Sequence, residues 1–208
     1  MTRSEHHSDV ADGARGRALR SNATTEALRG AVRGMLEERG YQALTIEGVA
    51  ARSGVAKTSI YRRWPSKAEM AFDLMLHSSD ELPPLDDRGS LVGDMDALAG
   101  RVVALVAGPL GRRIFPGLIG DAAGDPALME RLRTTIVLDG RKEIAHVLER
   151  SVRRGELADT EAVADLQAVL IGAALMFVLF EPELDEELLR NKIADLARAV
   201  LFRSRTPS

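Results

Sequence analysis

Six polar side chains of types that can bind nucleic acid occur between residues 57 and 63. They are Lys57, Thr58, Ser59, Tyr61, Arg62 and Arg63. The apolar residues Ile46, Val49, Val55 and Ile60 have the spacing of a core shared by two short helices, which leaves the polar side chains largely outward. Short polar groups can hydrogen-bond to base edges in a major groove, and cations and hydroxyls can hold phosphates. The pattern therefore predicts a DNA-binding surface.

The residues between and beside these helices predict a tight turn and two phosphate anchors. Ala50 stands where the helices cross, and Gly54, four residues later, supplies a turn with positive φ. Thr45 begins the first helix, where free amides and the helix dipole favour an anion. Lys67, just inside the next helix, can reach the opposite DNA backbone. The segment predicts a helix-turn-helix, and a helical hairpin with a solvated basic face is the alternative.

The whole chain is predicted to be all-α, with about nine helices, because it contains no alternating pattern typical of strands. Thr24 or Thr25 is the expected cap of the first helix, and Asp125-Pro126 is expected to open a long one. The predicted helices span residues 24–39, 46–53, 57–64, 67–77, 91–107, 112–123 (short or bent), 126–154, 160–180 and 185–202.

Composition and charge divide the chain into three parts. Residues 1–22 are polar and predict a disordered arm, residues 23–70 a helix-turn-helix DNA-binding domain, and residues 71–208 a larger helical ligand-binding and dimerisation domain. Residues 1–70 carry 12 Lys+Arg and 8 Asp+Glu, whereas the remainder carries 16 and 23. These balances of +4 and −7 indicate that the first part meets polyanions, although chance also gives such a difference.

Several functional classes find no support in the sequence. The chain has no cysteine, so disulfides and thiolate metal sites are excluded. It has no apolar leader and no apolar run that approaches the ~20 residues of a membrane span, so we expect a cytoplasmic protein. Nucleophile-elbow, phosphate-loop, dinucleotide and zinc-protease motifs do not occur, and we expect neither an enzyme nor a cofactor nor a metal.

Residues 24–70 resemble the DNA-binding domain of the TetR/AcrR family of bacterial regulators. The resemblance is carried by Gly54-Val-Ala-Lys-Thr-Ser-Ile-Tyr-Arg-Arg-Trp-Pro-Ser-Lys67, the Gly40-Tyr41 helix stop and Thr45. It implies a helical homodimer that binds an operator, often a palindrome, and usually represses until a small molecule releases it. It places Lys57, Thr58, Ser59, Tyr61 and Arg62 in the groove and Thr45, Tyr61, Trp64 and Lys67 near phosphates. The family often has histidine where Arg63 stands, and arginine there is expected to strengthen non-specific phosphate attraction.

Two helices near the C-terminus are expected to form the dimer interface. The segment 160–180 is apolar on more than one side and so needs cover on more than one side. Two such helices from each of two chains would make a four-helix interface, and a buried core helix in a monomer is the alternative. The predicted interface residues are Leu170, Ala174, Val178, Leu189, Ile193, Leu196 and Val200.

A small and at least partly hydrophobic effector is expected in the larger domain. The candidate lining residues are Met95, Leu98, Val102, Phe115, Leu118, Ile119, Leu132, Ile136 and Phe177. Plain core is the alternative for each of them. A helical adaptor without operator recognition, or an enzyme of another type, remains the alternative for the chain as a whole. Arg15, Arg17 and Arg20 of the arm could enter the minor groove or belong to a solubilising tail.

Overall fold

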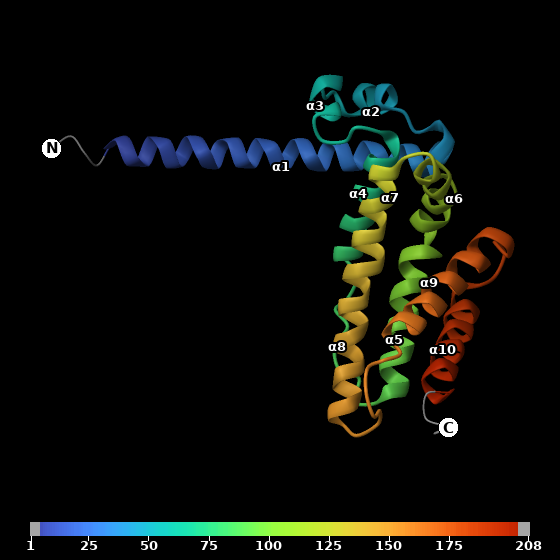
Figure 1. The fold of residues 1–208 in the computed structure, drawn as a ribbon. Coiled ribbons are helices and arrows are strands. Elements are labelled where there is room, and N and C mark those ends of the chain that lie inside the picture. Colours follow the sequence, from blue (N-terminus) through green and yellow to red (C-terminus); the bar gives the residue numbers. More distant parts are fainter. Residues whose placement is uncertain (1–4, 204–208) are drawn as a thin grey trace. The chain divides into compact units, whose positions relative to one another are not determined.

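The computed structural model describes residues 5–203, with side chains described for residues 22–79 and 81–202. Helices dominate this part of the chain, and it contains no strand (Figure 1). The all-helical prediction is confirmed. The chain divides into two compact units, residues 1–70 and 71–208.

The first unit is a small helical cluster around one apolar core. Leu28, Val32 and Leu36 lie on one stripe of the first helix and are at most 1% exposed, as are Val49 and Ile60 of the helices packed nearby. Its elements are α1 (Glu5–Arg39), the 3-10 turn η1 (Tyr41–Ala43), α2 (Ile46–Ser53), α3 (Lys57–Tyr61) and the first turn of α4 (Lys67–Asp80).

The start of α1 differs from the prediction. The helix begins at Glu5, so residues 5–22 are helical where the sequence predicts a disordered arm, and neither Thr24 nor Thr25 caps it. No proline interrupts this segment, and extending a helix that is already anchored by its packed end adds one hydrogen bond per residue. Residues 1–4 lie outside the described residues. The side chains of Arg15, Arg17 and Arg20 also lie outside them, so the minor-groove role remains a prediction.

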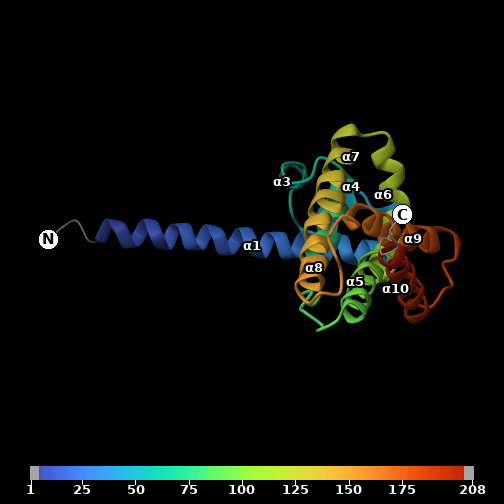
Figure 2. The ribbon, with the colours of Figure 1, turned by 60° about the horizontal axis from the view of Figure 1, so that its bottom comes forward.

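The second unit is built around α5. This helix contacts four others, and α5, α9 and α10 lie side by side in both ribbon views (Figure 1 and Figure 2). Met95, Leu98 and Val103 of α5 are at most 4% exposed because these neighbours cover them. Besides α4, the elements are α5 (Leu91–Val106), α6 (Pro109–Ala123), α7 (Pro126–Leu132), η2 (Arg133–Asp139), α8 (Gly140–Arg153), α9 (Val163–Phe180) and α10 (Glu186–Arg203).

Helix α9 is apolar along nearly its whole length. By length and composition alone it could cross a membrane, as could the bent pair α5 and α6 if the two formed one span. In the structure α5, α6, α8 and α10 all contact α9, and Leu166, Leu170 and Ala174 are fully buried against them. This packing is that of a core helix of the second unit.

The predicted long helix from Pro126 is interrupted by a π-helical segment, η2. Asp125 caps its start as predicted, accepting hydrogen bonds from the amides of Ala127 and Leu128 at 3.0 and 3.1 Å. The sequence pattern gives no sign of the π turn, because its cause comes from another helix. The side chain of Gln167 on α9 donates to the carbonyl oxygens of Ile136 and Val137, and a side chain inserted into the backbone ladder distorts a helix.

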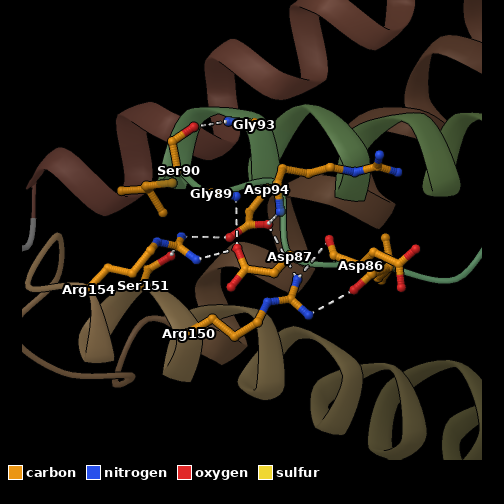
Figure 3. A network of polar contacts seen from close by, with 12 residues as sticks. Asp86, Asp87, Gly89, Ser90, Gly93, Asp94, Arg150, Ser151 and Arg154 are labelled. Carbon is orange, nitrogen blue, oxygen red and sulfur yellow. Dashed lines mark hydrogen bonds and ion pairs between the residues drawn. The ribbon is translucent and has the colours of Figure 1, made fainter.

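A buried carboxylate joins the start of α5 to the end of α8 (Figure 3). Asp94 is 1% exposed, and its oxygens accept hydrogen bonds from Arg154 at 2.8 Å, Arg150 at 3.3 Å and the amide of Arg88 at 3.1 Å. The guanidinium of Arg150 also donates to the carbonyl of Leu85 at 2.8 Å. The network therefore fastens the loop that precedes α5 to α8.

Two further carboxylates complete this network. Glu156 accepts from the amide of Leu91 and from Arg154, and these two contacts lower its pKa, with the Leu91 amide contributing most. A hydrogen bond from the amide of Gly89 lowers the pKa of Asp87, and Arg154 lowers it further. Since both pKa values are lowered in the folded state, this stabilisation is present above their ordinary values and is lost as the pH falls through the lowered ones.

Replacing the buried carboxylate should weaken the second unit. We expect Asp94→Asn to lower the free energy of unfolding by about 1–3 kcal/mol, because the buried carboxylate loses its charge-assisted hydrogen bonds with Arg150 and Arg154. Asp96→Asn, two residues along the same helix, is the control, because Asp96 is 54% exposed and pairs with Arg198 at the surface. Its expected cost is below ~1 kcal/mol. Urea unfolding followed by circular dichroism measures both, and equal costs would contradict this account.

Candidate nucleic-acid interface and ligand cavity

The turn between α2 and α3 has the geometry that the sequence predicts. Thr45 caps α2, with its hydroxyl accepting from the amide of Gly48 at 3.0 Å. Gly54 ends the helix with φ 71° and ψ 7°, in the left-handed region, and its amide donates to the carbonyl of Ala50 at 3.0 Å. Ile46, Val49 and Ile60 are buried below the turn, as predicted, whereas Val55 is only half-buried.

Helix α3 and its C-terminal cap residue Arg62 present four exposed polar side chains, which we call the recognition surface. They are Lys57, Thr58, Tyr61 and Arg62. Ile60 on the opposite side is fully buried and fixes the rotation of the helix, while Ser59 is half-buried beside it. Tyr61 is 50% exposed, and a tyrosine offers a partner both an apolar ring and a polar hydroxyl. The exposed hydroxyls and cations suit base edges and phosphates.

Three of the predicted contact residues are less available than expected. Trp64 is 4% exposed and its large apolar ring belongs to the core, so its predicted place near phosphates stays a prediction. Arg63 is half-buried and donates to the hydroxyl of Thr25. Lys67 is half-buried, with its ammonium 4.7 Å from the ring centre of Tyr41. Lys67 is thus held by a cation–π contact within the unit.

Two ion pairs that the sequence analysis did not identify join α2 to its neighbours. Arg52 of α2 makes a two-pronged pair with Glu38 of α1 at 2.6 and 2.7 Å, and this hydrogen bonding lowers the pKa of Glu38. Lys57 pairs with Glu47 at 3.0 Å and lowers the pKa of that carboxyl. The first pair ties α2 to α1. The second places an acid beside the recognition surface, so Lys57 is partly neutralised until it meets DNA.

The second unit contains a cavity of about 410 Å³ lined by α4, α5, η2, α8 and α9. Leu98, Val102 and Ile136 line it, as the sequence predicts. The sequence analysis missed its polar lining, including Arg101, Glu143 and the buried Gln167. These residues carry no local motif, and only the packing of helices that are distant in sequence brings them together.

Six of the predicted lining residues do not line this cavity. Met95, Phe115, Leu118 and Leu132 are buried in the core, at most 8% exposed. Ile119 is 39% exposed on α6, and Phe177 is half-buried on α9. Apolar periodicity identifies the buried side of a helix, but a cavity wall and a filled core give the same pattern. The sequence therefore could not separate them.

Most of the predicted dimer residues lie on the faces of α9 and α10 that their own chain covers. Leu170, Ala174, Leu189 and Ile193 are fully buried within this chain, and Val178 is 5% exposed. These five residues pack inside their own unit, and of the predicted set only Leu196, at 44%, and the half-buried Val200 retain surface. A helix that is apolar all round gives no sign of which face its own chain covers.

The two helices expose a different apolar face, which we call the apolar stripe. On α9 it consists of small residues followed by Met176 and Leu179, and on α10 of large residues separated by polar ones. Its members are Ala164, Ala168, Gly172, Met176, Leu179, Leu188, Leu196, Ala199 and Phe202. Helices α9 and α10 pack against each other, and Met176, Leu188 and Phe202 are 44–50% exposed. Large apolar side chains grouped in this way mark interaction surfaces.

The fold and the site define a class: a helix-turn-helix DNA-binding protein with a second helical unit that encloses a cavity. Two family models match the chain. "Bacterial regulatory proteins, tetR family" matches residues 28–74, and "Tetracyclin repressor-like, C-terminal domain" matches residues 85–196, more than half of the chain. The chain belongs to the TetR family of transcriptional regulators, and the predicted membership and DNA-binding role are confirmed.

Relatives of known name agree with this assignment. The chain is 27% identical over 190 residues to the HTH-type transcriptional regulator YdeS of Bacillus subtilis, covering 91% of this chain and 96% of that one. It is 28% identical over 156 residues to the DNA-binding transcriptional repressor TetR of Mycobacteroides abscessus, covering 73% and 82%. The crystal structure of the TetR family regulator SCO0332 superposes with a TM-score of 0.67 at 28% identity, covering 84% and 97%.

A methyl group at the turn should destabilise the first unit. Alanine in the left-handed conformation is strained by about 1–2 kcal/mol, so we expect Gly54→Ala to lower the free energy of unfolding by that amount. Gly30→Ala is the matched control: Gly30 lies within α1, a Cβ there meets no atom within 4 Å, and alanine in a helix is favoured by up to ~1 kcal/mol. Trp64 is the single tryptophan and lies in this unit, so its fluorescence during urea unfolding measures both variants. A Gly54→Ala protein as stable as Gly30→Ala would show that the turn needs no glycine.

Proposed function

We propose that this chain is a homodimeric repressor that binds a palindromic operator through its recognition surface and leaves it when a small molecule fills the cavity. The observation that carries the proposal is the exposed set of Lys57, Thr58, Tyr61 and Arg62 on a short helix whose other side is fixed by the buried Ile60. Such a helix fits a major groove, with side chains free to contact base edges. The assignment to the cytoplasm follows from binding to bacterial DNA.

Paired recognition surfaces require a dimer. Two major-groove half-sites lie roughly 34–36 Å apart along B-DNA, a span that needs two copies of α3. The apolar stripe supports a symmetric interface, because the same surface on two chains can pair about a two-fold axis. Its small residues on α9 allow two such helices to approach closely, and its large residues supply apolar area to bury.

Control by a small molecule is supported by the position of helix α4. Residues 67–70 of α4 belong to the first unit, whereas Met75, Leu76 and Ser79 farther along the same helix line the cavity. Release requires that the ligand bind more tightly to a conformer in which the two recognition surfaces are badly spaced for successive grooves. The ligand and DNA affinities are then coupled reciprocally, typically by 1–3 kcal/mol.

The first test of the DNA-binding role is a titration of a labelled duplex from the region upstream of the protein's own coding sequence. We expect selective binding that weakens steeply with salt, and a loss of about 5- to 100-fold in Arg62→Ala, because a cation that meets a base or a phosphate is removed. Arg153→Ala, an exposed arginine at the end of α8, should bind as the unchanged protein does.

The pattern of loss separates two roles of Arg62 and tests the proposal. A loss on the upstream duplex alone indicates base contact, whereas an equal loss on a scrambled duplex with a smaller salt dependence indicates phosphate contact. If both duplexes bind weakly and equally, and Arg62→Ala changes nothing, the recognition surface does not read DNA. The helical adaptor would then replace the repressor.

The dimer surface is tested with two methionines of nearly equal exposure. Met176 lies in the apolar stripe and is 44% exposed, and Met129 lies on α7 and is 45% exposed. We expect Met176→Glu to convert the dimer to a monomer, because burying an unpaired carboxylate in an interface is costly, and Met129→Glu to leave it a dimer. Sedimentation velocity measures the state. A Met176→Glu protein that remains fully dimeric would place the interface elsewhere.

A further inference from the structure

Gln167 is the most buried polar side chain of the cavity wall, with 5% of its surface exposed. Its amide nitrogen donates to the carbonyl oxygens of Ile136 at 2.9 Å and Val137 at 3.0 Å, which uses both of its hydrogens. Its amide oxygen accepts from the Nε of Arg141 at 3.1 Å. An amide oxygen has two lone pairs, so the hydrogen bond from Arg141 leaves one acceptor position.

The surrounding backbone is shaped to hold this amide in place. The two carbonyls belong to the π-helical segment η2, and π turns recur at functional sites. A Cβ on Gly140 would lie 2.9 Å from the amide nitrogen of Gln167, so glycine leaves the space that the side chain occupies. The orientation of the amide is fixed, because the nitrogen must face the carbonyls and the oxygen must face the guanidinium.

The charged groups of the cavity wall already have partners of opposite charge. Arg101 lies 3.5 Å from Glu143 and also donates to the carbonyl of Pro83 at 3.1 Å. Asp139 pairs with Lys142 at 2.7 Å. An ion that entered the cavity would have to leave water and compete with these pairs for a partner, which costs more than the transfer of a neutral molecule.

We propose that the cavity binds an uncharged, mainly apolar molecule that carries a hydrogen-bond donor, and that Gln167 selects it by accepting that hydrogen bond. The inference rests on the proposed function in treating the cavity as a ligand site, but it concerns which ligand binds there. The volume of about 410 Å³ suits a molecule of two or three rings or a chain of similar bulk. The donor is a hydroxyl or an N–H group.

A set of three related dyes tests this directly on the full-length protein without DNA. Phenyl-naphthylamine is uncharged, has one N–H donor and fluoresces in apolar surroundings. Its N-methyl derivative lacks the donor, and anilinonaphthalene sulfonate carries a negative charge. We expect phenyl-naphthylamine to bind more tightly than its N-methyl derivative, by about fivefold for one hydrogen bond, and the sulfonate to bind most weakly.

Variants locate the effect at Gln167. We expect Gln167→Met to bring the ratio of the two neutral dyes' affinities to about one, because it removes the acceptor, and Gly140→Ala to lower this ratio by displacing the amide. Gln42→Met, at the other, exposed glutamine of the chain, is the matched control and should retain the preference. Val102→Trp, which fills the cavity, should abolish binding of both neutral dyes.

The outcomes distinguish this inference from the proposed function. Equal losses for both neutral dyes in Gln167→Met would give Gln167 a structural role only and overturn its role in selection. Tighter binding of the sulfonate would overturn the uncharged class of ligand. Binding that persists in Val102→Trp, or its absence from the unchanged protein, would overturn the cavity as the site. Because no DNA is present, failure of operator binding leaves these results unaffected.

Discussion

Helix α9 has no charged side chain after Asp165. Other elements must therefore cover its apolar faces, and the arrangement of the second unit depends on this constraint. Helices α5, α6, α8 and α10 contact it, yet its small residues Ala168 and Gly172 and the neighbouring Met176 stay exposed and need cover from another source. Gln167, on the same helix, cannot be buried without hydrogen bonds, and it obtains them from η2. One apolar helix thus contributes to the core and to the proposed dimer surface, and its buried amide, Gln167, provides a polar group in the cavity wall.

The two units differ in how they are held together, and the difference fits their roles. In the first unit α2 packs on α1 and α3 packs on α2, and the Glu38–Arg52 pair ties α2 to α1 at the surface. This supports a recognition surface with one fixed shape. In the second unit the cavity interrupts the packing, and the Asp94 network fastens α8 to the start of α5 away from that cavity. In the function that we propose, a ligand alters the cavity side of the unit while the Asp94 network holds the start of α5.

Helix caps and turns were predictable from the sequence, whereas the choice of which apolar face of a helix its own chain buries was not. The caps Thr45 and Asp125 and the left-handed Gly54 were found correctly, because each depends on a few neighbouring residues. The buried Trp64, the π turn and the cavity lining were missed, because each depends on side chains from other elements. Most of the predicted dimer residues lie on faces that their own chain covers, because α9 is apolar on every side and its periodicity cannot rank those faces.

The sequence alone determined the helical class, the helix-turn-helix and its polar recognition residues, because periodicity, capping and turn chemistry act over fewer than ten residues. It also determined the family, through the stretch from Gly54 to Lys67. Only the tertiary structure decided which apolar residues form core, cavity wall or exposed stripe, since that choice depends on which helices lie beside each face. It alone placed Gln167 against Ile136 and Val137, some thirty residues away in sequence, where two backbone carbonyls needed donors.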